Sequence, residues 1–258
     1  MCHDHCPHPV RGGDAVTDDE IRIPLVSGEL PAFIAIPDAQ PAPAVLVMHD
    51  INGVNDFYRD ITRRLALAGY LAVLPDLFHR EGPPADDTRE AKQARMRSMQ
   101  QSNTLTDIQS ALLWLQRHPQ ATGKLGTVGF CMGGTYVMLA ASRDPAPDAS
   151  VAFYGFPRRE RTPTNPILPS DADEVINLKS PLLALWGTED AGVGMDNVDQ
   201  YEEQLAQYRK DHEFVRYPGI GHGFLTFEPG KPATEPSQDA WDRMLRLFDE
   251  RLTQAEVS

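Results

Sequence analysis

The amino-acid sequence predicts a three-layer α/β fold, in which helices cover both faces of a mostly parallel β-sheet. Short apolar segments of the kind that a parallel sheet buries on both faces alternate with helical segments. An antiparallel hairpin precedes this alternation, because Ile21, Ile23 and Leu25 alternate with other residues and a Ser-Gly-Glu turn at 27–29 reverses the chain. Neither an internal repeat nor an interdomain linker interrupts the pattern. We therefore expect residues 1–19 to be a flexible N-terminal segment and residues 20–258 to be a single domain.

The remaining elements follow from apolar runs and helical periodicity. A continuous apolar run predicts a buried strand at residues 44–48, and Ile61, Leu65 and Ala68 share one face of a predicted helix over 56–68. The other predicted strands lie at residues 70–74, 125–130, 151–154, 182–186 and 213–217. The other predicted helices lie near residues 88–101, 104–117, 133–142, 198–208 and 238–252. Four prolines interrupt residues 155–180, which we expect to be irregular.

The composition excludes several classes of function. The 258 residues include 24 basic and 37 acidic side chains, and the net charge of −13 argues against nucleic acid or an anionic membrane as a partner. Three cysteines cannot form a disulfide framework, the N-terminus is polar, and no apolar stretch is long enough to span a membrane. We expect a soluble cytoplasmic protein that acts on a small molecule, as a monomer or a small homo-oligomer.

Cysteine and histidine cluster near the N-terminus, at Cys2, His3, His5, Cys6 and His8. Thiolate and imidazole are the ligands that zinc prefers, but a structural zinc site needs ligand pairs that a folded loop brings together. No second Cys/His pair follows this cluster. We therefore expect no metal site and no cofactor, and we assign the cluster no function.

The segment 129–134, with the sequence GFCMGG, carries the most informative pattern. It joins a predicted buried strand to a predicted helix and matches the nucleophile elbow G-x-nucleophile-x-G, with Cys131 as the nucleophile. The nucleophile of an elbow occupies a strained turn, which needs glycines nearby so that strand and helix can approach. The helix N-terminus then favours a thiolate and can hold an oxyanion. The alternative is a buried structural cysteine beside a glycine-rich turn.

A cysteine at an elbow needs a histidine as base and an acid that orients it, in the order nucleophile, acid, histidine. Asp190 follows the predicted strand at 182–186, and His222 lies in a glycine-rich loop after the strand at 213–217. Because sites in parallel sheets form at the carboxyl ends of strands, we expect Cys131, Asp190 and His222 to converge. Glu189 competes with Asp190 for the role of the acid. The less well placed histidines are interpreted as structural or surface residues: His49, His79, His118 and His212.

With these residues the chain resembles the dienelactone hydrolases (carboxymethylenebutenolidases), a family of α/β-hydrolases with a Cys-Asp-His triad. The motifs that carry the resemblance are HDINGV at 49–54, GY at 69–70, PDL at 75–77, GFCMGG at 129–134 and GHGF at 221–224. The resemblance implies the α/β-hydrolase fold, with a mostly parallel central sheet and helices on both faces. It also implies hydrolysis of a carboxylic ester or lactone without a metal or a cofactor.

The resemblance assigns a role to each residue of the expected site. Cys131 attacks the carbonyl and forms a thioester acyl-enzyme, His222 activates the thiol and later the water, and Asp190 fixes the tautomer of His222. The backbone N–H groups of Ile51 and Met132 form the oxyanion hole. A thiolate suits substrates whose leaving group is already stabilised, such as the enolate released from an enol lactone.

Three further positions follow from the family pattern. A glutamate that interacts with the resting cysteine precedes the oxyanion-hole residue in the family, and Asp50 stands there in this chain. Two arginines anchor the substrate carboxylate in the family. Counting back from Cys131 without gaps places the first at Arg89, whereas Thr226 occupies the position of the second.

Two alternatives to a lactone hydrolase stay open at this stage. Thr226 favours a general carboxylesterase or thioesterase of the same fold, which acts on a neutral substrate. A non-catalytic binding or redox protein that uses the Cys131 thiol is the third interpretation. Activity on dienelactone relative to a neutral ester distinguishes the first two, and the third predicts no turnover.

Overall fold

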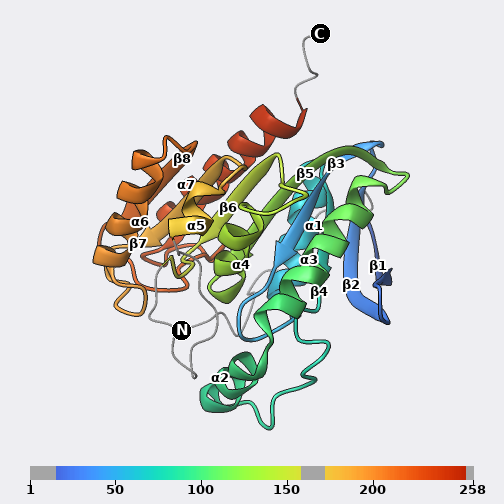
Figure 1. The fold of residues 1–258 in the computed structure, drawn as a ribbon, viewed down its shortest axis with the longest axis horizontal. Coiled ribbons are helices and arrows are strands. Elements are labelled where there is room, and N and C mark those ends of the chain that lie inside the picture. The colour runs from blue at the N-terminus through green and yellow to red at the C-terminus, as the bar shows by residue number, and fades with distance from the viewer. Residues whose placement is uncertain (1–15, 158–171, 254–258) are drawn as a thin grey trace.

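One eight-stranded sheet forms the centre of the computed structural model, which describes residues 16–157 and 172–253 (Figure 1). The strands are β1 (Val16–Pro24), β2 (Glu29–Pro37), β3 (Ala42–Met48), β4 (Leu71–Pro75), β5 (Ala121–Phe130), β6 (Ala149–Phe153), β7 (Leu182–Gly187) and β8 (His212–Tyr217). Their order across the sheet is β1-β2-β4-β3-β5-β6-β7-β8. The sheet is antiparallel at β1, β2 and β4 and parallel from β4 to β8. This topology confirms the expected α/β-hydrolase fold.

The first strand begins earlier than the sequence predicts. Val16 of β1 pairs with Pro37 of β2, so residues 16–19 belong to the sheet and not to a flexible segment. The pattern conceals this part of the strand because residues 17–20 are polar and exposed, at the edge of the sheet. The N-terminal Cys/His cluster lies outside the described residues.

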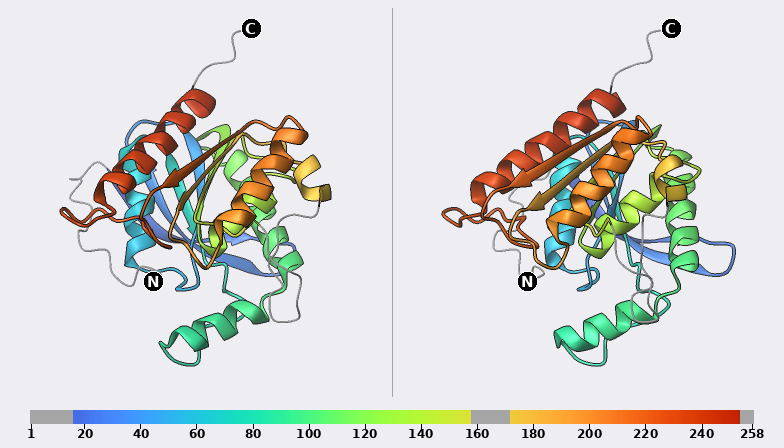
Figure 2. Two further views of the ribbon diagram at one scale, coloured as in Figure 1. Left: turned by 90° about the vertical axis from the view of Figure 1, so that its left-hand side faces the viewer. Right: turned by 60° about the vertical axis from the view of Figure 1, so that its left-hand side comes forward.

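The helices are α1 (Asp56–Leu67), α2 (Arg89–Ser98), α3 (Gln101–Gln116), α4 (Met132–Ala140), α5 (Ala172–Ile176), α6 (Met195–Gln207) and α7 (Thr234–Phe248), which a π-helical turn, η1 (Asp249–Thr253), continues. In Figure 2, α1 and α7 cover one face of the sheet, and α3, α4 and α6 cover the other. Every residue of α4 is buried, whereas α2 buries none of its residues. No helix in the described ranges is long and apolar enough to cross a bilayer.

The described part of the stretch predicted to be irregular contains one short helix. Residues 172–176 form α5, where Val175 is buried and Glu174 pairs with Arg143, which lies three residues beyond the end of α4. The prediction missed α5 because a five-residue helix is too short to display a periodic pattern. Residues 158–171 of the same stretch lie outside the described part of the chain.

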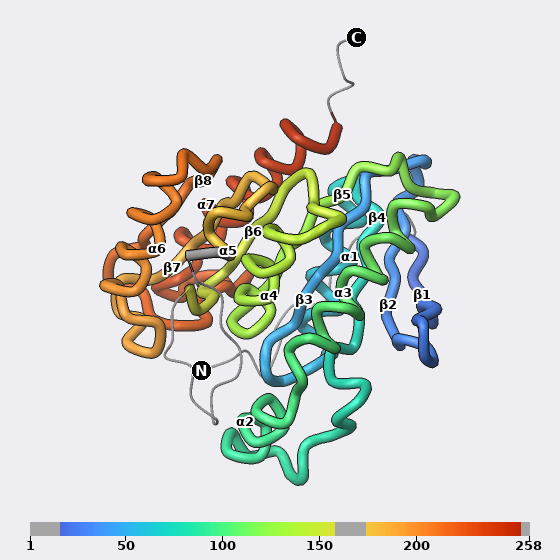
Figure 3. Tube along the Cα trace, in the orientation of Figure 1, coloured from blue at the N-terminus to red at the C-terminus, as the bar shows by residue number. Residues whose placement is uncertain are grey.

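One end of the sheet collects the segments that matter for function. The loops after β3, β5, β7 and β8 all follow the carboxyl ends of parallel strands, where sites of open α/β sheets form. Helix α2 stands at this same end, beyond the loop that follows β3 (Figure 3). The Arg95 side chain of α2 connects the two, because its Nη2 donates a hydrogen bond to the carbonyl of Ile51 at 2.8 Å.

Candidate active site

Cys131 occupies a strained turn between β5 and α4. Its backbone has φ 55° and ψ −113°, a left-handed conformation that a residue with a side chain rarely adopts. The glycines two residues to either side make this turn possible. A Cβ on Gly129 would lie 2.2 Å from the carbonyl oxygen of Gly133, and a Cβ on Gly133 would lie 2.1 Å from that of Met48. The strand, the turn and the helix therefore pack backbone against backbone, as the elbow pattern predicts.

The elbow holds Cys131 at the N-terminus of a fully buried helix. Cys131 is itself 5% exposed, and its backbone N–H donates to the carbonyl of Phe153 in the neighbouring strand β6 at 3.0 Å. The positive end of a helix dipole favours the anionic form of a thiol. The position of Cys131 is thus suited to a thiolate nucleophile.

Asp190 and His222 form a hydrogen-bonded pair at the ends of β7 and β8. His222 Nδ1 lies 2.6 Å from Asp190 Oδ2, and the Asp190 side chain is fully buried. The other oxygen, Asp190 Oδ1, accepts hydrogen bonds from the backbone N–H groups of Gly192 and Val193, each at 3.1 Å. Glu189 is exposed, so the geometry selects Asp190 as the partner of the histidine.

The loop of His222 rests directly on the end of β7. A Cβ on Gly187 would lie 2.0 Å from the carbonyl oxygen of Ile220, and that same oxygen accepts a hydrogen bond from the Glu189 N–H at 2.8 Å. The Gly219 N–H donates to the hydroxyl of Thr188 at 2.9 Å. These contacts fix the histidine loop to the loop that carries Asp190.

Two aromatic rings that no sequence pattern predicts as part of the site flank His222. The ring centroid of Tyr154 lies 5.2 Å from that of His222 in an edge-on arrangement, and that of Phe156 lies at 5.5 Å. Tyr154 follows β6 with φ 40°, which is an outlier for an aromatic residue. Tyrosine and phenylalanine flanking the glycine after a strand carry no distinctive sequence pattern, so only the structure reveals their contact with the histidine.

Two backbone N–H groups beside the elbow are not engaged within the described chain. Neither the Ile51 N–H nor the Met132 N–H has an acceptor among the described residues. Because Gly133 contacts the backbone of Met48 and His49, the start of α4 lies against the end of β3, where the loop of Ile51 begins. Two free donors at this place can bind the oxygen of a tetrahedral intermediate.

Known proteins are similar to this chain over almost its whole length. The family model described as "Dienelactone hydrolase family" matches residues 30–252. The chain belongs to the dienelactone hydrolase family. A Rhodococcus opacus protein named carboxymethylenebutenolidase is 30% identical, with 98% of each chain covered. A Yersinia pestis protein that carries the same name provisionally is 36% identical over 89% of this chain and 86% of its own.

Solved structures of the dienelactone hydrolase family have the same fold. The crystal structure of a Klebsiella pneumoniae protein, provisionally named a dienelactone hydrolase, matches with a TM-score of 0.84 and 31% identity. That match covers 92% of this chain and all of the Klebsiella chain. The protein is therefore a carboxymethylenebutenolidase-like hydrolase, and its substrate is a small molecule.

The residue at the family's glutamate position contributes to the loop after β3. Asp50 is 1% exposed, its Oδ1 accepts from the Asn52 N–H at 2.8 Å, and its Oδ2 accepts from the Asn52 side chain at 3.0 Å. The carboxylate therefore shapes the turn that carries Ile51.

The predicted substrate-binding residue Arg89 lies on α2, and its role stays a prediction. Arg89 is exposed at the first position of α2, whereas Arg95, further along the same helix, contacts the loop at Ile51. Arg95 also lies over the Phe78 ring, with its guanidinium carbon 3.8 Å from the ring centroid.

The position of the family's second arginine is occupied by a residue with a structural role. The Thr226 N–H donates to the Ser237 hydroxyl at 3.0 Å, and the Thr226 hydroxyl accepts from the Glu228 N–H at 3.1 Å. Thr226 thus holds the loop between β8 and α7 and supplies no positive charge. Within the described ranges, no group of three or more His, Cys, Asp or Glu side chains is arranged to hold a metal ion.

Proposed function

We propose that this hydrolase cleaves a lactone or an activated carboxylic ester through a thioester acyl-enzyme, with Cys131 as nucleophile, His222 as base and Asp190 as the orienting acid. The observation that carries the proposal is the strained, left-handed Cys131 at the N-terminus of α4, beside strand ends that bear a hydrogen-bonded Asp190–His222 pair. A cysteine that only fills space in the core does not need a strained backbone at a helix N-terminus, so this conformation indicates a function.

The proposed first half-reaction transfers the acyl group to the cysteine. His222 accepts the thiol proton, and the Cys131 sulfur attacks the substrate carbonyl. The hydrogen bond between His222 Nδ1 and Asp190 holds the ring so that Nε2 is the nitrogen that exchanges the proton. Collapse of the tetrahedral intermediate releases the alkoxide or enolate, which takes up that proton.

The second half-reaction returns the enzyme to its resting form. His222 accepts a proton from water, and the resulting hydroxide attacks the thioester. Cys131 then leaves as the thiolate and takes that proton back from His222, which releases the carboxylic acid. The N–H groups of Ile51 and Met132 stabilise the oxyanion in both half-reactions. A thiolate is a better leaving group than an alkoxide, so the first half-reaction favours esters whose leaving group is already stabilised.

The surroundings of Arg95 bear on the charge of the substrate. Arg95 contacts the oxyanion loop at Ile51, and its Nε–H has no acceptor among the described residues, so this donor is available to a substrate carboxylate. Burial lowers the pKa of Arg95, and the nearby carboxylates of Asp76, Glu81 and Asp50 oppose that shift. Three acidic neighbours and the absence of a second arginine at Thr226 favour the alternative, a general carboxylesterase or thioesterase on a neutral substrate.

A test of the nucleophile uses p-nitrophenyl acetate and the variant Cys131→Ala. We expect the wild-type protein to gain the mass of one acetyl group during turnover, and Cys131→Ala to lose both the adduct and at least about 10³-fold of kcat. The double variant Cys2→Ser, Cys6→Ser is the matched control and keeps full activity. Unchanged hydrolysis by Cys131→Ala would reject the proposed function, and no turnover by the wild type would favour a thiol-based binding or redox protein.

A second test separates the two substrate classes. Turnover of dienelactone and of p-nitrophenyl acetate is compared in the wild type and in Arg95→Met. If a carboxylate is recognised, kcat/KM for dienelactone exceeds that for the neutral ester, and Arg95→Met lowers the ratio by about tenfold. A wild-type preference for the neutral ester would assign the protein to the esterase or thioesterase class.

A further inference from the structure

The peptide unit that joins Asp50 to Ile51 carries the N–H group proposed for the oxyanion hole. In a trans peptide the carbonyl of Asp50 and the N–H of Ile51 are opposite ends of one rigid plane. Whatever holds the Asp50 carbonyl therefore sets the direction of the Ile51 N–H. The carbonyl accepts two hydrogen bonds, from the His49 Nδ1 at 2.7 Å and from the Gly53 N–H at 3.2 Å.

His49 makes this contact from a completely enclosed position. The residue has no exposed surface, and its second ring nitrogen, Nε2, accepts a hydrogen bond from the Leu77 N–H at 3.0 Å. A backbone N–H can only donate, so Nε2 carries no proton and Nδ1 is the nitrogen that donates to Asp50. Burial lowers the pKa of His49 to about 4, so the ring is neutral at physiological pH. The two contacts together determine the tautomer.

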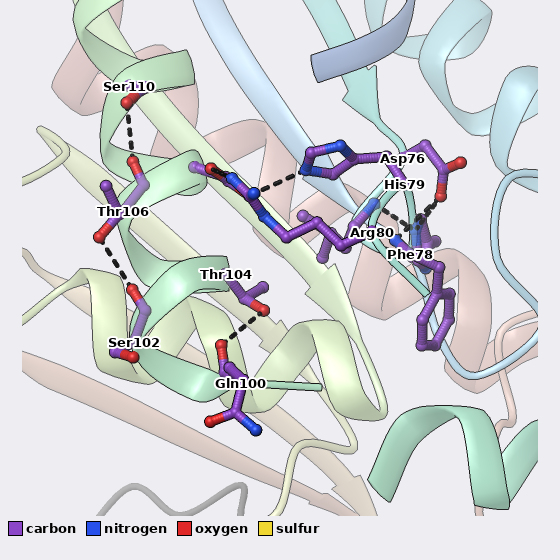
Figure 4. A network of polar contacts seen from close by, with 12 residues as sticks. Asp76, Phe78, His79, Arg80, Gln100, Ser102, Thr104, Thr106 and Ser110 are labelled. Atoms are coloured by element: carbon purple, nitrogen blue, oxygen red, sulfur yellow. Dashed lines mark hydrogen bonds and ion pairs between the residues drawn. The ribbon is translucent and has the colours of Figure 1, made fainter. Parts of the chain in front are cut away.

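The loop after β4 fixes the ring of His49 in place. The His49 ring stacks on Phe78, with centroids 5.3 Å apart and planes 25° apart. The Phe78 N–H donates to Asp76 at 2.9 Å (Figure 4). The side chains of His79 and Arg80 form hydrogen bonds to Asp107 of α3. The support of His49 is therefore built from β4, its loop and α3, far from the elbow in sequence.

The next peptide plane is held at both of its ends. The Ile51 carbonyl accepts from Arg95 Nη2 at 2.8 Å, and the Asn52 N–H donates to Asp50 Oδ1 at 2.8 Å. Both carbonyls and the Asn52 N–H of this turn are thus engaged, and the Ile51 N–H has no acceptor among the described residues. The turn presents one donor and immobilises the groups around it.

We propose that His49 is a positioning residue of the oxyanion hole, which aims the Ile51 N–H by holding the Asp50 carbonyl. The hydrogen bond that it donates also polarises the peptide, which makes the Ile51 N–H a stronger donor to the oxyanion. This inference rests on the proposed function, and it assigns a role in the reaction to a histidine that the sequence analysis interprets as structural or a surface residue.

Two substitutions separate this role from packing. His49→Asn keeps a donor at the place of Nδ1 and loses the acceptor for Leu77, whereas His49→Gln keeps the acceptor and loses the donor to Asp50. Each variant loses one buried hydrogen bond, so both should lower the Tm by similar amounts. We expect His49→Gln to lower kcat for p-nitrophenyl acetate by roughly ten- to hundredfold, with little change in KM. We expect His49→Asn to retain most of the wild-type kcat. His118→Gln is the control for a partly buried histidine outside this support, because among the described residues its ring accepts only from the Gln120 N–H in the turn after α3.

Alkylation by iodoacetamide supplies the second measurement. Displacement of iodide by the Cys131 thiolate forms no oxyanion, so we expect the alkylation rate of all three variants to match that of the wild type. Equal kcat values for His49→Gln and His49→Asn would overturn the positioning role. A drop in alkylation that parallels the loss of kcat would also overturn it, because the damage would then include the cysteine. Failure of the proposed function has a different signature, since Cys131→Ala would then remain active.

Discussion

Two histidines at the same end of the sheet differ in almost every physical respect. His222 lies after the edge strand β8, its side chain is 19% exposed, and its partner is the carboxylate of Asp190. His49 follows the central strand β3 and is fully buried, and in the described part of the chain both of its ring nitrogens form hydrogen bonds to backbone groups. The first arrangement suits a ring that exchanges a proton during turnover, and the second suits one that stays neutral at physiological pH. One side chain can therefore serve as a proton carrier or as a fixed dipole, depending on what surrounds it.

The largest expected effect comes from removing the proton carrier. His222→Ala should lower kcat/KM for p-nitrophenyl acetate by about 10³-fold, because neither the thiol nor the water then has a base. Asp190→Asn should cost about 10²- to 10⁴-fold by favouring the wrong tautomer of His222. Steady-state kinetics measures both. His212→Ala, at the start of the same strand, is the control and should keep wild-type activity; a comparable loss there would mean that damage to β8, and not to the base, explains the result.

A pair of glycine substitutions displaces one half of the site at a time. Gly133→Ala would force the elbow away from the oxyanion loop, since the new Cβ would lie 2.1 Å from the Met48 carbonyl oxygen. Gly187→Ala would push the histidine loop away from β7, since its new Cβ would lie 2.0 Å from the Ile220 carbonyl oxygen. Each should cost about 3–5 kcal/mol of unfolding free energy, measured in urea. Gly221→Ala is the control, because a Cβ there meets no atom within 4 Å.

The kinetic consequences of the glycine pair should differ. In folded Gly187→Ala, acylation of Cys131 should slow because the base His222 is displaced. Alkylation of Cys131 by iodoacetamide at high pH should persist, because the thiol is then already ionised. In folded Gly133→Ala, the acylation and the alkylation of Cys131 should both slow, because the elbow itself moves. Identical profiles for the two variants would contradict the division of the site into two separately held halves.

The smallest effect is a pH dependence of stability that the buried histidine produces. His49 has a folded pKa of about 4 against an ordinary value of 6.5, so between these values the unfolded chain binds a proton that the folded protein does not. Stability is therefore full above about pH 6.5 and falls as the pH approaches 4, by about 3 kcal/mol in total. The charges nearest His49 are Asp76, 3.9 Å from Nε2, and Arg95.

Urea unfolding at pH 7 and pH 5 measures this dependence. His118 shifts in the same direction, because partial burial lowers its pKa, so the comparison requires a variant that lacks only the His49 titration. His49→Asn is that variant and should lose most of the pH dependence. An unchanged dependence in His49→Asn would assign it to other groups.

The residues of the site that the sequence predicts are those that belong to short local motifs. The elbow around Cys131 and the glycine-rich loop around His222 are short motifs, and the order of the chain placed Asp190 between them. The contacts of His49, Tyr154 and Arg95 could not be predicted in this way, because each depends on how segments remote in sequence pack together. The same holds for the fold: apolar runs predicted the buried strands, whereas the polar start of β1 and the five residues of α5 showed no pattern.

The place of β8 at the edge of the sheet has a consequence for how the protein inactivates. This strand is only partly buried, yet the loop after it carries His222, whereas Cys131 follows the buried centre of the sheet. Edge elements open locally at a lower free-energy cost than the whole domain. In a denaturant titration, hydrolysis should therefore disappear before the circular dichroism of the helices does. In that range of concentrations the chain would keep its architecture and its ordered thiol while having already ceased to be an enzyme.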